Sequence, residues 1–248
     1  MILEKITSSD MREYNTIEDF ITFGKLYPNA EFAIQAHPPK FYKYQPRYEW
    51  TNTFATACKV NNINMALHIN GPWRDDMCSN GIIAPEVKHL MDLRRDNGGH
   101  VIGRIQININ GGNQEYMFNA NRVADIIREY PDIEFIFQYT PAQYERVTAL
   151  DKTGAKFSLL YDASGGRGKT PDEYYGPVMQ NHKMGYSGGI SPENVEYILD
   201  RVNMVLPSDY VTWIDAEKKL QNPYTGRFDV ARALEYVRRA NNWIHRQR

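Results

Sequence analysis

Residues 187–195 read Ser-Gly-Gly-Ile-Ser-Pro-Glu-Asn-Val, so a glycine pair stands directly before a strong helix-start signal. Ser191 is a residue type preferred at an N-cap, and Pro192 is the type preferred at the first helical position. The stretch therefore predicts a helix that begins at Pro192. Backbone N–H groups at the start of a helix attract anions. The predicted phosphate contacts are the backbone amides of Gly188, Gly189 and Ile190.

An earlier stretch, residues 161–169, has a similar organisation. It reads Tyr-Asp-Ala-Ser-Gly-Gly-Arg-Gly-Lys and places Asp162 at the end of a strand-like apolar segment. In α/β barrels and open α/β sheets, the carboxyl ends of the strands carry the active site. Together the two stretches predict that the protein binds a phosphorylated small molecule at such an edge.

A strand-like segment recurs about every 30 residues, which is the size of one strand–helix unit. The predicted strands are Ile2–Thr7, Phe32–Ala36, Met65–Ile69, Ile102–Ile107, Glu134–Tyr139, Phe157–Tyr161, Lys183–Tyr186 and Val211–Ile214. Helical spacing of apolar residues lies between them, for example at Val230–Ile244. This alternation predicts an α/β fold, a (β/α)8 TIM barrel that forms a single domain over residues 1–248. A doubly wound open sheet is the alternative.

The charge balance gives no support to a nucleic-acid or anionic-membrane surface. The chain has 29 Lys and Arg against 30 Asp and Glu, a net charge of -1. No apolar stretch approaches the roughly 20 residues of a membrane helix, and the first residues lack the apolar run of a secretory signal. We therefore expect a cytoplasmic protein that binds neither nucleic acid nor membrane. Cys58 and Cys78 are expected to be simple thiols.

The segment Gly71–Pro85 is longer than a typical loop between a strand and a helix. It is predicted to be either a lid that contacts the ligand or a packed surface excursion.

Residues 157–197 resemble one enzyme family specifically, the phosphoribosylanthranilate isomerases, which are TIM barrels of the tryptophan pathway. Asp162 followed by Gly-Gly-Arg-Gly-Lys is similar to the sixth-strand segment of that family, where a strand-end Asp precedes Gly-Gly-Thr-Gly-Lys. Residues 187–195 resemble its seventh-strand phosphate loop. Weaker similarity extends to Lys5–Thr7, to Gln106 and to residues 213–215.

The resemblance implies an Amadori-type aldose–ketose isomerisation of a phosphorylated ribose derivative, and we expect no cofactor. In that reaction a general acid opens the sugar ring and a general base removes the proton from C2. Asp162 matches the acid. Thr7 stands where the family has its basic cysteine, and a threonine hydroxyl is not a base near neutral pH.

Three interpretations therefore remain open. The first is an isomerase whose base has been replaced. The second is a non-catalytic or divergent phosphosugar-binding barrel that has lost the base. The third is a different phosphosugar enzyme, such as an epimerase.

Two histidines are candidate replacement bases, because the ordinary pKa of histidine suits proton abstraction. His37 ends the second predicted strand and His68 the third, and each is alternatively a hydrogen-bonded structural group. With Asp162 or Asp215 they also suggest a metal site, but no metal-binding spacing of histidines supports it, so no metal is predicted.

Further polar residues at the predicted strand ends and loops complete the candidate site. Arg167, Lys218 and Lys219 are candidate phosphate ligands, and Arg47 is the candidate for a substrate carboxylate. Gln106, Gln138 and Asp215 end the fourth, fifth and eighth strands. The expected partner is a phosphorylated small molecule, and the chain is expected to be a monomer or a homodimer.

Overall fold

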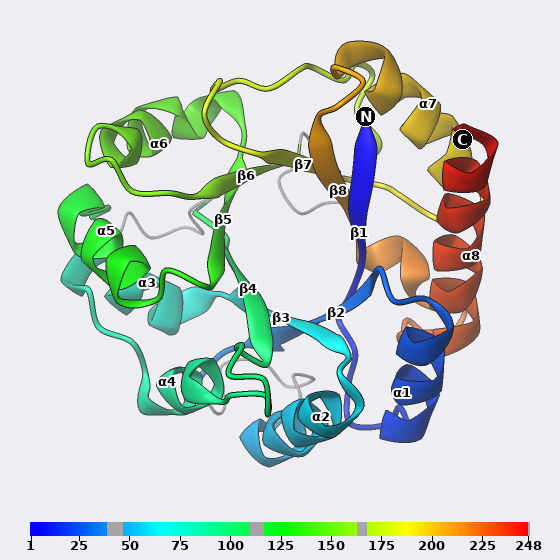
Figure 1. Cartoon of the computed structure of the whole chain (residues 1–248), viewed down its shortest axis with the longest axis horizontal. Coiled ribbons are helices and arrows are strands. Elements are labelled where there is room, and N and C mark those ends of the chain that lie inside the picture. Colours follow the sequence, from blue (N-terminus) through cyan, green and yellow to red (C-terminus); the bar gives the residue numbers. More distant parts are fainter. Residues whose placement is uncertain (39–46, 110–116, 163–167, 248) are drawn as a thin grey trace.

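The computed structural model describes residues 1–38, 47–109, 117–162 and 168–247, and its eight parallel strands form a closed barrel (Figure 1). The strands are β1 (Ile2–Ser9), β2 (Ala30–Ala36), β3 (Asn64–Ile69), β4 (Ile102–Ile107), β5 (Glu134–Tyr139), β6 (Ser158–Tyr161), β7 (Met184–Ser187) and β8 (Val211–Ala216). Each strand pairs with its neighbours in chain order, and β1 also pairs with β8. The predicted TIM barrel is confirmed, and the open sheet is excluded because the β1–β8 pairing leaves no edge.

Helices surround the barrel (Figure 1). They are α1 (Ile17–Leu26), α2 (Tyr48–Asn61), α3 (Gly71–Asn80), α4 (Pro85–Asp92), α5 (Ala120–Glu129), α6 (Tyr144–Asp151), α7 (Val195–Val205) and α8 (Val230–Gln247), with the 3-10 turns η1 (Pro141–Gln143) and η2 (Lys218–Leu220). Both α3 and α4 lie between β3 and β4, whereas residues 168–183 contain no α-helix. Across the ranges described above, none of the helices has the length and apolar character that a bilayer span needs.

The start of α7 differs from the prediction. The helix begins at Val195 rather than at Pro192, because a side-chain-bonded turn comes first. Ser191 Oγ accepts a hydrogen bond from the Glu193 amide at 3.2 Å, and the Ser191 amide donates to Asn194 Oδ1 at 2.8 Å. These bonds cap a first turn at Ser191, and the Val195 amide donates to the Ser191 carbonyl at 3.0 Å. Asn194, with φ of -122°, then departs from helical geometry, so the regular helix starts only at Val195.

The segment Gly71–Pro85 is also organised differently from the predicted loop. It contains α3, with Pro72 in its first turn, and the helix ends at Gly81, whose φ of 70° lies in the left-handed region. Proline at the start and glycine just past the end are the usual boundaries of a helix. The excursion is therefore an ordered helix on the outside of the barrel.

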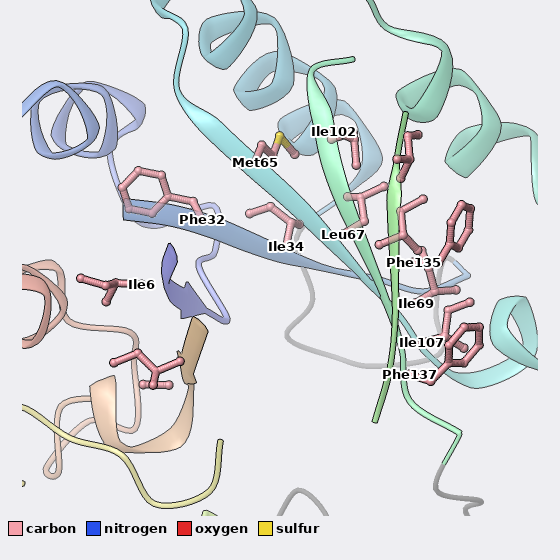
Figure 2. Close-up of a cluster of buried hydrophobic side chains, with 14 of the residues drawn as sticks. Ile6, Phe32, Ile34, Met65, Leu67, Ile69, Ile102, Ile107, Phe135 and Phe137 are labelled. Carbon is pink, nitrogen blue, oxygen red and sulfur yellow. The ribbon is translucent and has the colours of Figure 1, made fainter. Parts of the chain in front are cut away.

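Along each strand, side chains point alternately toward the helices and into the barrel, as the pleat of a strand requires. Phe32 and Ile34 of β2, and Leu67 and Ile69 of β3, belong to one large buried cluster (Figure 2). Neighbouring positions on the same strands point into the barrel. The main hydrophobic core therefore lies between the sheet and the helices.

The inside of the barrel is mostly polar. Glu31 and Arg104 form a fully buried ion pair at 2.6 Å. Thr7 Oγ1 donates to Glu31 Oε1 and accepts from Arg104 Nη2, both at 2.9 Å. The Arg104 guanidinium lies 4.8 Å from the ring centre of Trp213, which packs with Ile136 and Leu160 in a small inward-facing apolar cluster. These groups fill the barrel below its carboxyl-end mouth.

Candidate functional site

A polar cavity of about 610 Å³, counted with its open mouth, lies at the carboxyl ends of the strands. This is the end at which barrel enzymes place their active sites. The predicted residues that line it are His68, Gln106, Gln138, Asp162, Gly188, Gly189, Ile190, Asp215, Lys218 and Lys219. Segments from the third to the eighth strand thus contribute predicted residues to one space.

Asp162 follows β6 directly and is 4% exposed. Gln138 Nε2 donates a hydrogen bond to Asp162 Oδ2, and the Asp162 amide donates to the carbonyl of Tyr139 at 3.2 Å. Both partners belong to β5, so the neighbouring strand fixes this carboxylate at the wall of the cavity.

Asp215, near the end of β8, is 7% exposed. Its Oδ1 accepts a hydrogen bond from Ser9 Oγ at 2.5 Å, and its Oδ2 lies 3.9 Å from His68 Nε2. Burial raises the pKa of Asp215 to about 7, although the Ser9 hydrogen bond and the charge of Arg104 act in the opposite direction. This carboxyl group therefore changes its charge near neutral pH.

His68, on β3, is buried and stays uncharged at neutral pH. Its burial and the nearby positive charge of Arg104 lower the pKa of His68 to about 3. The imidazole is thus a neutral hydrogen-bonding group beside Asp215.

Glu217 lines the same cavity and was missed by the sequence reasoning. Burial, followed by the negative charges of Asp10 and Asp215, raises the pKa of Glu217 to about 8. Its position two residues after Asp215 could have indicated that Glu217 faces the same cavity, since alternate residues of a strand share a face. Asp162, Asp215 and Glu217 place three carboxyl groups in one confined space.

The glycine pair forms a tight loop after β7. The φ angles of Gly188 and Gly189 are 99° and 67°, which favour glycine. A Cβ on Gly189 would lie 2.4 Å from the Thr170 amide nitrogen, so the two loops are in close contact. The carbonyl of Gly189 accepts a hydrogen bond from Asn194 Nδ2 at 3.0 Å.

All three residues of this loop, Gly188, Gly189 and Ile190, line the cavity. Within residues 1–38, 47–109, 117–162 and 168–247, the amides of Gly188, Gly189 and Ile190 donate to no protein acceptor. Backbone donors at such a place suit an anion. Lys218 and Lys219 of η2 are exposed at the rim, where they add positive charge beside these amides.

Thr7 does not line the cavity in the described structure. Its hydroxyl lies in the layer below, where both of its hydrogen bonds join it to Glu31 and Arg104. The Thr7 hydroxyl therefore links the buried Glu31 and Arg104 inside the barrel.

Two other predicted residues, His37 and Arg47, also lie apart from the described cavity lining. His37 follows β2, and its pKa is lowered to about 4 by burial and by the charge of Arg74. Arg47 is exposed and forms an ion pair with Glu13 at 3.0 Å. Arg167 falls outside the described residues.

The cysteines and the acidic groups show no metal centre in the described parts of the chain. Cys58 and Cys78 are free, as expected, and burial raises the pKa of each thiol to about 12. Among these residues, no group of three or more His, Cys, Asp or Glu side chains has a metal-binding arrangement.

Comparison with solved structures finds similar barrels at low sequence identity. N-(5'-phosphoribosyl)anthranilate isomerase from Pyrococcus furiosus has 13% identity and a TM-score of 0.55, with 98% of this chain and 100% of that chain covered. The Thermotoga maritima phosphoribosyl anthranilate isomerase has 15% identity and a TM-score of 0.56, with the same coverage. No protein-family model and no curated protein sequence matches the chain. At these identities the likeness shows the fold alone.

Proposed function

We propose that this barrel binds a phosphorylated sugar at the carboxyl ends of its strands and interconverts its aldose and ketose forms. The proposal is supported chiefly by one observation: two buried carboxyl groups, Asp162 and Asp215, line the same cavity as residues 188–190, whose amides donate to no acceptor among the residues that the structure describes. They come from β6 and β8, on either side of the glycine loop that follows β7. Two barrels of similar fold are phosphoribosylanthranilate isomerases.

The phosphate binds first in this proposal. Its oxygens accept hydrogen bonds from the amides of Gly188, Gly189 and Ile190, and the ammonium groups of Lys218 and Lys219 add attraction from the rim. Binding at this loop places the sugar end of the ligand between the two carboxyl groups.

The isomerisation needs one acid and one base. Asp162 gives a proton to the ring oxygen as the C1–O bond breaks, and the C1 carbonyl forms as the O1 hydroxyl loses its proton. Asp215 then removes the proton from C2 while O1 is protonated, which gives an enediol. Protonated Asp215 returns the proton to C1 as the C2 hydroxyl loses its own proton and becomes the ketone. C1 is reduced and C2 is oxidised by the same internal shift, so no external oxidant is required. Asp215 suits the role of base because a pKa of about 7 matches the working pH.

The acid obtains its proton from the carboxyl cluster. Asp162, Asp215 and Glu217 repel one another when ionised. Burial raises the pKa of Asp215 to about 7 and that of Glu217 to about 8, so Glu217 keeps its proton at neutral pH and supplies it to the acid in this proposal.

An assay of two substrates tests this function. Wild-type protein is expected to abolish the fluorescence of phosphoribosylanthranilate or to convert ribose 5-phosphate to a ketose. Asp162→Asn and Asp215→Asn are expected to lower kcat/KM by about 100-fold or more, the usual range for loss of an acid or base. Asp209→Asn is the matched control, because Asp209 is exposed in the turn before β8. Full activity in both site variants would reject the assignment.

A binding protein without catalysis is the second candidate function. It is favoured by Thr7, whose hydroxyl is held by Glu31 and Arg104 below the cavity. Calorimetry that finds ribose 5-phosphate bound, together with no chemical change in the recovered ligand, would favour this candidate over the isomerase.

A further inference from the structure

Five carboxamide side chains gather on one side of the cavity. Four consecutive strands, β2 to β5, or the residues directly after them, supply these groups, whereas the carboxyl groups, the glycine loop and the lysines come from the β6–β8 side. In the closed barrel these strands form opposite arcs of the wall (Figure 1). The carboxamides are those of Gln35, Asn70, Gln106, Asn108 and Gln138.

A carboxamide suits a hydroxyl group particularly well. Its oxygen accepts hydrogen bonds and its nitrogen donates them, and a hydroxyl does both through one atom. The carboxamides carry no charge, so they neither compete with the phosphate loop for the anion nor repel the phosphate. The composition of this wall therefore matches the hydroxyl-bearing part of a ligand.

Gln138 gives the most specific indication of a missing partner. It is 4% exposed, and its Nε2 donates to Asp162, which fixes the orientation of the amide. Its Oε1 is buried and accepts no hydrogen bond from the residues that the structure describes. Buried acceptors are normally satisfied, so a donor from the ligand is expected at this atom.

Gln35 and Asn70 are already held in place. Asn70 Nδ2 donates to Gln35 Oε1 at 2.5 Å, and this bond directs Gln35 Nε2 and Asn70 Oδ1 away from each other. The bond joins the ends of β2 and β3 before any ligand arrives. A rigid donor–acceptor pair loses little entropy when it binds a hydroxyl.

We propose that the β2–β5 wall binds the hydroxyl groups of a polyhydroxylated sugar chain, so that the natural ligand is a pentose or hexose phosphate rather than a sugar phosphate with an aromatic substituent. This inference rests on the proposed function, since it takes the phosphate to lie on the glycine loop. Gln138 Oε1 accepts from a ligand hydroxyl next to Asp162. The same residue thereby links substrate recognition to the acid.

Calorimetry with four probes tests the inference. Ribulose 5-phosphate is expected to bind at least tenfold more tightly than glycerol 3-phosphate and inorganic phosphate, because only the pentose phosphate reaches the carboxamides. The fourth probe is an N-aryl phosphoribosyl adduct. Binding of glycerol 3-phosphate as tight as that of ribulose 5-phosphate, or tighter binding of the aryl adduct, would overturn the inference.

Two variants test whether the carboxamides provide the affinity for the sugar. Gln138→Leu and Gln106→Leu are each expected to weaken ribulose 5-phosphate binding by about tenfold, which is about 1.4 kcal/mol, and to leave inorganic phosphate binding unchanged. Gln180→Leu is the matched control, because Gln180 is exposed and lies outside the cavity lining. Gln106 comes from a different strand, so its variant still decides the question if Gln138→Leu does not fold.

The outcomes separate this inference from the proposed function. Selective loss of sugar affinity in these variants without any turnover by the wild type supports the hydroxyl-binding wall and rejects the isomerase. Turnover that is insensitive to both glutamine variants supports the isomerase and rejects the wall. Failure of every phosphate probe to bind rejects both.

Discussion

Nε2 of His68 lies 3.9 Å from Oδ2 of Asp215 in the buried floor of the cavity. The geometry is that of an ion pair, but burial lowers the pKa of His68 to about 3 and raises that of Asp215 to about 7. At neutral pH the histidine is therefore neutral, and Asp215 alone titrates. A base with a neutral neighbour is ready to accept a proton, because no fixed positive charge on His68 holds it ionised.

The first prediction concerns the pH dependence of turnover. If ionised Asp215 is the base, kcat/KM for the sugar phosphate rises with pH through about 7 and falls above about 8, where Glu217 loses the proton that the acid step requires. The measurement is the pH profile of wild type and of Asp215→Asn. The variant is expected to lose this rise along with about 100-fold or more of its rate. A profile that keeps the same rise in Asp215→Asn would assign the ionisation to another group.

The second prediction concerns the free energy of unfolding. The ionised form of Asp215, which the reaction needs as its base, lowers the stability of the folded protein. The pKa of Asp215 is higher in the folded protein than its ordinary value of 3.8, so the folded state binds this proton more tightly. The stabilisation that protonated Asp215 gives to the folded state is fully present below about pH 4, and it is lost as the pH rises to about 7. Ionised Asp215 is therefore a cost to the fold at pH 8.

Asp215→Asn removes that cost. Between pH 5 and 7, the free energy of unfolding of the wild type falls by about 1.4 kcal/mol per pH unit because of Asp215. The free energy of unfolding of the variant should therefore rise by roughly 2 to 3 kcal/mol relative to that of the wild type between pH 5 and pH 8. Urea unfolding at the two pH values measures this difference. His68 has its own pH dependence, because its pKa is about 3 in the folded protein and ordinarily 6.5, but wild type and variant share it, so it cancels in the difference between them. Asp209→Asn should show no such trend.

The third prediction separates Thr7 from the chemistry. Thr7→Val removes the donor to Glu31 and the acceptor for Arg104. Loss of hydrogen bonds to buried charged groups costs on the order of 1–3 kcal/mol, whereas kcat/KM should stay within about twofold because the hydroxyl lies below the cavity. Thermal unfolding and the isomerase assay measure the two effects. Thr56→Val, on the exposed face of α2, is the control. A stable variant with a large loss of kcat would instead place Thr7 in the reaction.

The barrel could be predicted from the sequence because its signals are local. The predicted strands Ile102–Ile107 and Glu134–Tyr139 match β4 and β5 at both ends, since β-branched or aromatic residues recur through both segments between turn residues. The start of α7 could not be predicted in the same way. Ser191 and Pro192 satisfy the rules for a helix start and do cap a first turn, but the φ of -122° at Asn194 delays the regular helix to Val195.

The site could be predicted where a strand end carries a polar residue on the inward face. Asp162, His68, Gln106 and Asp215 were found this way, and the cavity contains all four. The role of Thr7 depends on Glu31 and Arg104, which lie 24 and 97 residues further along the chain. No local pattern indicates a three-way contact over such separations, so the structure was needed to place Thr7 below the cavity.

The last prediction tests whether the shape of the glycine loop is needed for phosphate binding. In Gly189→Ala the new Cβ would lie 2.4 Å from the Thr170 amide nitrogen and 2.8 Å from the Lys169 carbonyl carbon. Both are backbone atoms, so the loop must move, and its amides move with it. We expect a loss of inorganic phosphate affinity of about tenfold or more.

Gly226→Ala is the control that separates this movement from simple backbone strain. Gly226 has almost the same φ as Gly189, 65° against 67°, but a Cβ there would meet nothing within 4 Å. Both substitutions place an alanine in the left-handed region, which costs roughly 1–2 kcal/mol. Only Gly189→Ala also displaces the backbone at Thr170. Calorimetry with inorganic phosphate should therefore distinguish two variants of similar intrinsic strain. Equal phosphate affinity in the two would mean that the contact between residues 189 and 170 does not shape the anion site, and that the phosphate is held by the lysines of η2 instead.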